Sequence, residues 1–66
     1  MKINVDREAD ALYFHLSDDS IRESEEIAPG LVLDYNERGE VVGFEMLGLS
    51  RRASAPDLKK LEFQTV

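Results

Sequence analysis

Residues 11–16 read ALYFHL, and this run decides the class of fold. Large apolar residues occupy every second position, and a second set occupies the positions between them. The first set is Leu12, Phe14 and Leu16, and the second is Ala11, Tyr13 and His15. A period of two is typical of a β-strand with one buried face, because successive side chains point to opposite sides of the strand. The run therefore predicts a half-buried strand.

Four flanking segments also have the character of strands, by alternation or as short apolar runs. They are residues 2–6, 21–27, 31–35 and 40–47. The second of them is rich in glutamate, which is typical of an exposed or edge strand. Turn-forming residues separate the segments, among them Pro29, Gly30 and Gly39. Because short connections make sequential strands antiparallel neighbours, the sequence predicts a five-stranded antiparallel β-meander.

The last predicted strand has a period of two and one glycine. Val42, Phe44 and Met46 share one face of it. Gly43 lies on the other face, and glycine inside a strand indicates a β-bulge or a close backbone approach.

The period changes after residue 50. Ser54 and Asp57 have the spacing of a capping box, and Pro56 lies in the first turn. Leu58 and Leu61 are three residues apart and share one face of a helix. The pattern predicts a short helix over about residues 55–61 that must pack on the sheet to be stable.

The predicted fold class is therefore α+β, in a single domain of residues 1–66. The β-meander occupies residues 1–50, and a basic segment with the short C-terminal α-helix occupies residues 51–66. A chain of this size supports a core of only about 3–5 kcal/mol, so small domains need another source of stability. The chain has no cysteine and one histidine, which argues against disulfides and a zinc site. We expect a homodimer or a complex with another protein, with no metal and no cofactor.

Charge divides the chain into two parts. Residues 1–50 carry twelve acidic and four basic side chains, a net charge of −8, whereas residues 51–66 carry a net charge of +2. The acidic part would repel a phosphate backbone, so nucleic-acid binding is not expected. A basic protein partner is expected, since opposite fields steer encounter. The alternative is that the acidic charge only keeps a small protein soluble.

The sequence also predicts a location. No apolar run reaches the roughly 20 residues that span a membrane, and the N-terminal residues lack the apolar core of a signal peptide. The absence of cysteine is compatible with a reducing compartment. We therefore expect a cytoplasmic protein that does not enter a membrane.

The acidic stretch at residues 6–19 is the first candidate for a chemical site. Asp6 and Asp10 fall in one predicted turn, and Asp18 and Asp19 fall in the next. Asp is favoured in turns because its side chain accepts hydrogen bonds from nearby backbone N–H groups. The two turns lie about a strand length apart, on the order of 17–20 Å, so one metal cannot use both pairs. Turn chemistry is the better explanation.

His15 is the second candidate, as a general base or metal ligand. A general base needs an oriented partner, and only Glu45 and Asp34 are available in the pattern. No glycine-rich phosphate loop and no nucleophile elbow is present. We therefore expect no enzymatic activity, and we keep a small enzyme or metal-binder that uses His15 as the least favoured alternative.

A surface for association is the third candidate. If the helix covers the face with Phe14 and Phe44, apolar side chains remain on the other face and on the helix. These candidates for an interface are Tyr13, Val41, Leu47, Leu58 and Leu61. An apolar outer face is a common association surface.

Two long stretches of the chain resemble a known family. DREADALYFHLSD, residues 6–18, and ESEEIAPGLVLDYNERGEVVGFEML, residues 23–47, resemble small prokaryotic proteins described as domain of unknown function 2283. The shared elements are structural, so the resemblance implies a fold and no catalytic residue. The family tends to have Tyr in place of Val5, and an apolar or basic residue in place of His15. The second departure argues against a shared catalytic role for His15.

The resemblance also implies a kind of function. Genes of this family are often found beside small toxin-like genes, which implies an antitoxin-like or partner-binding role. An acidic protein that neutralises a basic toxin would fit the charge distribution. We therefore predict a non-enzymatic protein-interaction module that is antitoxin-like and binds a basic protein. The alternative is a structural or regulatory homodimer with no fixed partner.

Overall fold

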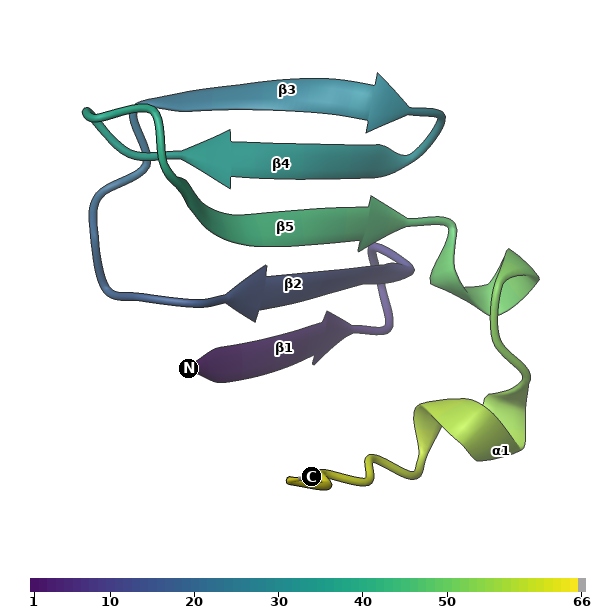
Figure 1. The fold of residues 1–66 in the computed structure, drawn as a ribbon. Helices are drawn as coiled ribbons and strands as arrows, with labels where there is room; N and C mark the ends of the chain where they lie inside the picture. Colours follow the sequence, from purple (N-terminus) through teal and green to yellow (C-terminus); the bar gives the residue numbers. More distant parts are fainter. Residues whose placement is uncertain (66) are drawn as a thin grey trace.

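The computed structural model describes residues 1–65 as one open antiparallel sheet with five strands (Figure 1). The strands are β1 (Lys2–Asp6), β2 (Ala11–His15), β3 (Glu23–Ala28), β4 (Leu31–Tyr35) and β5 (Val41–Leu47). A 3-10 turn η1 (Leu49–Arg51) and a short helix α1 (Ala55–Leu58) follow the sheet. Val66, which ends the predicted basic segment, lies outside the described residues. Within residues 1–65, no helix has the length and apolar character needed to cross a membrane.

The strand order is β1-β2-β5-β4-β3, so the predicted meander is wrong. The strand β5 lies between β2 and β4, and residues 16–22 connect β2 to β3 across one end of the sheet (Figure 1). This order leaves β3 at an edge, where all six of its residues are exposed. If β3 lay beside β2, as in the predicted meander, its three glutamates would lie in the interior of the sheet. The prediction of an acidic edge strand is confirmed.

The predicted faces of β2 and β5 are confirmed by the register between the two strands. Phe14 pairs with Phe44, and Leu12 pairs with Met46. Residues that pair directly across an antiparallel sheet have their side chains on the same face. The rings of Phe14 and Phe44 stack with centroids 5.2 Å apart and planes 11° apart. The alternation of the sequence therefore placed the aromatic residues on the correct face.

The helix is much shorter than predicted. α1 has four residues, against about seven expected, and the class α+β is not confirmed because this single turn does not form a layer. One half of the capping box is present, since the Asp57 carboxylate accepts from the Ser54 backbone N–H, and the Ser54 hydroxyl donates to the same carboxylate. Only Leu58 of the predicted apolar pair is partly buried, and Leu61 is 73% exposed. Without a second contact on the sheet, the helix has nothing to extend it.

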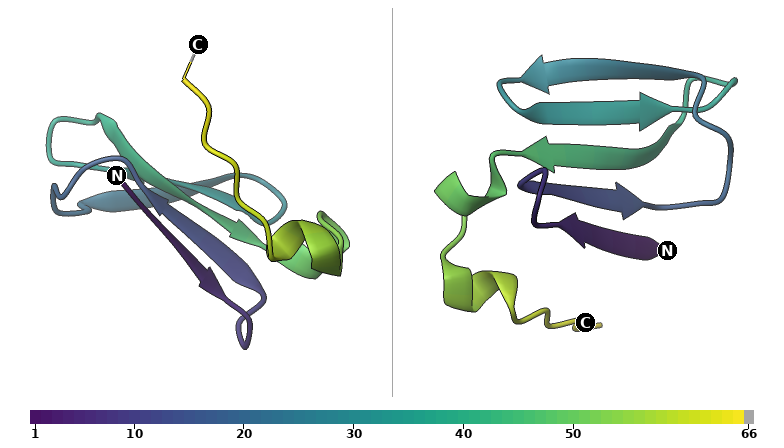
Figure 2. Two further views of the ribbon diagram at one scale, coloured as in Figure 1. Left: turned by 90° about the horizontal axis from the view of Figure 1, so that it is seen from below. Right: turned by 180° about the vertical axis from the view of Figure 1, so that it is seen from behind.

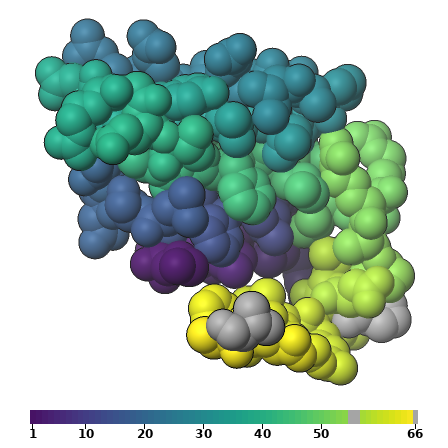
Figure 3. All heavy atoms as spheres, viewed as in Figure 1, coloured from purple at the N-terminus to yellow at the C-terminus, as the bar shows by residue number. Residues whose placement is uncertain are grey.

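Neither face of the sheet is covered by the C-terminal segment. In Figure 2, η1 and α1 lie at the end of the strands, and the last residues lead away from the sheet. The space-filling view shows the C-terminal residues beside β1, with the atoms of the other strands uncovered on this face (Figure 3). The main contacts between elements all join neighbouring strands. The fold is therefore a single β-layer, and the residues whose burial the structure describes include three buried apolar ones, Ala11, Val42 and Leu49.

Gly43 makes the close approach that the sequence predicted. The register of β4 and β5 shifts next to it, as in a β-bulge. A Cβ atom at this position would lie 2.5 Å from the carbonyl oxygen of Phe14 in β2. Gly39 confirms a second prediction, because its φ of 76° supplies the left-handed residue of the turn between β4 and β5.

Candidate functional site

The apolar face of the sheet is the largest feature of the surface. Two cross-strand rows run over four strands, and every side chain in them is apolar. We call these rows the apolar face: Ile3, Phe14, Phe44 and Leu33 form one row, and Val5, Leu12, Met46 and Leu31 form the other. Seven of the eight residues are half-buried, and Val5 is 46% exposed. A contiguous set of apolar side chains that stay in part accessible is a candidate binding surface.

The charged residues of this side of the sheet lie at one edge. Glu25 pairs with Leu33, and Glu23 pairs with Tyr35, so both glutamates are on β3 at the margin of the apolar face. The centre around the Phe14 and Phe44 stack contains no charged residue. An apolar centre with a polar rim is the usual anatomy of a protein interface.

The opposite face of the sheet is polar and contains a buried carboxylate. Asp34 is 2% exposed and accepts a hydrogen bond of 2.7 Å from the Ser24 hydroxyl. Glu45 lies on the same face, diagonal to Asp34 in the register. The pKa of Glu45 is raised, first by its hydrogen bond to Asp34, then by partial burial and by the Asp34 charge. The protonated form of Glu45 is thereby favoured over its charged form.

His15 does not meet the partners that an enzymatic role requires. His15 in β2 pairs with Gly43 in β5, and Asp34 in β4 pairs with the same glycine. His15 and Asp34 are thus separated by two strand spacings, about 10 Å. Across residues 1–65, no side-chain hydrogen bond orients His15, and no group of three or more His, Asp or Glu side chains could hold a metal. A geometric basis for a His15 site is therefore lacking in the described part of the chain.

The acidic residues at 6–19 act in turns and in anchoring contacts, as the sequence predicted. The Asp6 carboxylate accepts a hydrogen bond from the backbone N–H of Ala9. Asp10 has a positive φ of 53°, and its carboxylate accepts bonds from the N–H and the hydroxyl of Ser50 at 2.9 and 2.8 Å. Asp10 thereby fastens the 3-10 turn η1 to the end of the sheet.

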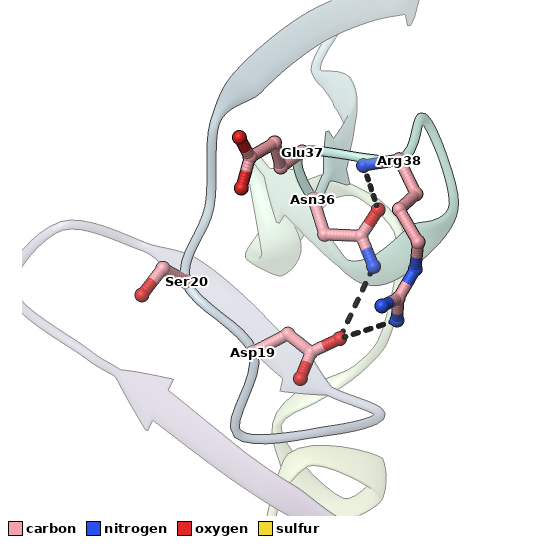
Figure 4. A pocket seen from close by; sticks show the side chains of 5 residues that line it. All are labelled: Asp19, Ser20, Asn36, Glu37 and Arg38. Atoms are coloured by element: carbon pink, nitrogen blue, oxygen red, sulfur yellow. Dashed lines mark hydrogen bonds and ion pairs between the residues drawn. The ribbon is translucent and has the colours of Figure 1, made fainter.

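Asp19 belongs to a second anchoring network, at the other end of β2 (Figure 4). The amide of Asn36 donates to Asp19 at 3.1 Å and to Glu40 at 2.9 Å, and Arg38 lies 3.7 Å from Asp19. The side-chain carbonyl oxygen of Asn36 accepts hydrogen bonds from the backbone N–H groups of Arg38 and Glu40. Bonds from Asn36 and Arg38 lower the pKa of Glu40. The network joins the turn between β4 and β5 to the crossing segment.

Replacement of Asn36 by alanine should lower the free energy of unfolding by about 2 kcal/mol, because it removes four hydrogen bonds of a side chain that is itself buried. Asn36 is only 7% exposed, so water cannot fully replace its amide. Urea denaturation of N36A measures the effect. Glu37→Ala in the same turn is the control, since Glu37 points away from the network in Figure 4. An equal loss in both variants would contradict the role given to Asn36.

The five interface candidates from the sequence are divided among different surfaces. Tyr13 and Leu47 lie on the polar face, and Val41 begins β5 with 42% of its surface exposed. Leu58 lines a hollow with Val5 and Leu49 at the end of the sheet, and Leu61 is exposed. The sheet does not gather these five into one patch, and their role in association stays a prediction.

Comparison with known protein families matches residues 2–50 to the family described as Protein of unknown function (DUF2283). The chain belongs to this family. The predicted resemblance is therefore confirmed. The DUF2283 match includes all five strands and ends within η1, before the basic segment. No curated protein and no solved structure matches the chain.

The structural roles of two residues, Asp34 and Asn36, were not predicted, since Asp34 was considered only as a partner of His15. Asp34 follows three apolar residues in LVLDY, and a carboxylate inside such a run is a signal for a buried, hydrogen-bonded group. Asn36 follows the same strand, and Asn in a turn often bonds to backbone N–H groups. Both signals are local, but their partners Ser24 and Asp19 come from distant segments.

Proposed function

We propose that this DUF2283 protein is a non-enzymatic protein-interaction module that binds another protein chain through its apolar face. The observation that carries the proposal is the set of eight apolar side chains in two cross-strand rows, none of them buried. A domain is stable when at least two layers enclose an apolar core. This sheet supplies one layer, and a protein partner supplies the other.

The charge of the chain supports a basic partner in an antitoxin-like role. Three acidic residues, Glu23, Glu25 and Glu26, lie on the exposed β3 edge, two of them at the rim of the apolar face. These positions can meet a basic surface without placing a charge in the apolar centre. A cytoplasmic location belongs to the same proposal, because the chain has no cysteine that would require an oxidising compartment.

The hollows of the surface favour binding of a protein over binding of a substrate. The hollow beside Asn36 and the hollow beside Leu58 each have a volume of about 270 Å³. Small-molecule sites are enclosed clefts of about 300–1,000 Å³ with convergent polar groups. Both hollows lie at the ends of the sheet and are formed by turns.

A structural or regulatory homodimer is the second candidate function. The small number of buried apolar residues favours it, because a single layer with three buried apolar side chains needs association to remain folded.

The proposal is tested with two matched variants in a capture experiment. Val5→Glu changes the apolar face, and Leu47→Glu introduces the same charge on the opposite face, at residues that are 46% and 39% exposed. Tagged wild-type protein and L47E should retain the same bound protein, and V5E should lose it. A basic partner should also be released at high salt. Equal capture by all three proteins would refute binding through the apolar face.

A further inference from the structure

The exposed surface of the chain is too large for a molecule that is complete as a monomer. A compact folded protein of 7.5 kDa exposes about 4,200 Å², whereas this chain exposes 5350 Å². Its radius of gyration is 12.7 Å, against about 11 Å for a compact chain of 66 residues. Part of the excess comes from the C-terminal segment, where Phe63 is 79% exposed. Exposed apolar side chains of the strands and of the connection between β2 and β3 add to it, among them Val5, Leu16, Ile21 and Ile27.

The size of the excess matches one side of a protein interface. The difference of about 1,100 Å² exceeds the roughly 800 Å² that each partner buries in a standard complex. Interfaces of about 2,000 Å² in total, with an apolar centre, are typical of obligate homodimers. From this area, and from the lack of a second layer, we propose that the apolar face is covered by the apolar face of a second copy of this chain. This inference rests on the proposed function and names the partner at that surface.

A second copy is favoured over other proteins because the apolar face must be covered whenever the chain is folded. An apolar face of eight residues must be shielded whenever the chain is folded, from its synthesis onward. The one protein always present at that moment is another copy of the same chain. A partner of different sequence would be needed in matched amounts before either could fold. The acidic β3 edge stays available for such a partner in the dimer.

The geometry of the face suits packing of two sheets. Flat rows of aromatic and aliphatic side chains interdigitate when two sheets lie about 10 Å apart, as in a β-sandwich. The stacked rings of Phe14 and Phe44 would lie near the centre of this sandwich. A two-fold axis gives both copies the same contacts, so one self-complementary surface is enough.

The acidic edge selects the direction of the two-fold axis. With the axis parallel to the strands, β3 of one copy lies over β1 of the other, because these strands form the two edges of the sheet. With the axis across the strands, the β3 edges coincide and Glu25 faces its own counterpart. Like charges in contact are unfavourable. The axis therefore runs parallel to the strands.

The test measures the mass and stability of the full chain by sedimentation velocity and thermal unfolding across a wide concentration series. We expect twice the mass of 7.5 kDa and a melting temperature that rises with protein concentration. V5E should weaken the dimer by about a hundredfold, since each of its two symmetric sites loses about tenfold. L47E should dimerise as the wild type does, because Leu47 lies on the opposite face of the sheet. Val5 is already 46% exposed in the single chain, so a folded monomer would tolerate the glutamate.

The remaining outcomes separate this inference from the proposed function. A folded wild-type monomer with a concentration-independent melting temperature contradicts the proposal that a second copy covers the apolar face. The capture experiment with V5E then decides alone whether a different protein uses the apolar face. A dimer that V5E leaves intact overturns both ideas, because association then uses another surface. If V5E fails to fold at any concentration, the concentration dependence of the wild type still decides between dimer and monomer.

Discussion

Replacement of Gly43 by alanine should lower the free energy of unfolding by about 3 kcal/mol, the upper part of the range for overpacking. The new Cβ would lie 2.5 Å from the Phe14 carbonyl oxygen and 3.6 Å from the Asp34 carboxylate. The first neighbour is backbone and cannot rotate away. β2 and β5 would have to separate at the pair that joins the two halves of the sheet. Thermal unfolding should show a melting temperature lower by more than about 10 °C.

Gly39 provides the control for this variant. No atom lies within 4 Å of a Cβ built at Gly39, so its requirement is only conformational, with φ at 76°. Asparagine tolerates this left-handed conformation better than other residues do. Gly39→Asn should therefore unfold close to the wild type. Similar melting temperatures for G43A and the wild type would mean that β2 and β5 have more room than the structure gives them.

The faces of the central strands could be predicted because they depend on local pattern alone. A period of two places Leu12 and Phe14 on one side of β2 whichever strand lies next to it. Phe44 and Met46 follow the same rule in β5, and the observed register brings the two sets together. The close approach at Gly43 was predictable for the same reason, since glycine interrupts an otherwise well-patterned strand.

The order of the strands could not be predicted from local pattern. The segment 16–22 contains turn-forming Ser and Asp residues and reads as a tight connection between neighbours. Its seven residues are also long enough to cross the end of the sheet, and about a third of sequential strands are not neighbours. The choice depends on pairing β5 with β2, which is a contact between residues about thirty positions apart.

The choice of interface candidates depended on one assumption about the helix. Tyr13 and Leu47 became candidates because the helix was expected to cover Phe14 and Phe44. The position of a helix with two leucines is set by tertiary contacts, and here only Leu58 finds neighbours, at Val5 and Leu49. Two apolar residues do not determine where a short helix docks. The eight residues of the apolar face therefore remain uncovered by their own chain.

The carboxyl pair on the polar face should make stability depend on pH in the acid range. The pKa of Glu45 in the folded protein is raised above its ordinary value of 4.5, mainly by its hydrogen bond to Asp34. The folded state therefore binds this proton more tightly than the unfolded state does. Its stabilising contribution is complete below pH 4.5 and is lost as the pH rises through the raised pKa. At neutral pH the two carboxylates repel each other across the sheet.

Glu45→Gln should remove this dependence and raise the free energy of unfolding at neutral pH by about 1 kcal/mol, the net value of a hydrogen bond. The glutamine amide can donate to Asp34 at every pH, whereas the glutamate carboxyl can donate only when it is protonated. Glu26→Gln is the matched control, because Glu26 shares the row of Glu45 but lies on the exposed edge strand β3. Thermal unfolding over a pH series should show a flatter acid-side profile for E45Q alone. A flatter profile in both variants would instead assign the dependence to the total negative charge. A Cβ at Gly43 would lie 3.6 Å from the Asp34 carboxylate, so the absence of this side chain leaves room for the partner of Glu45.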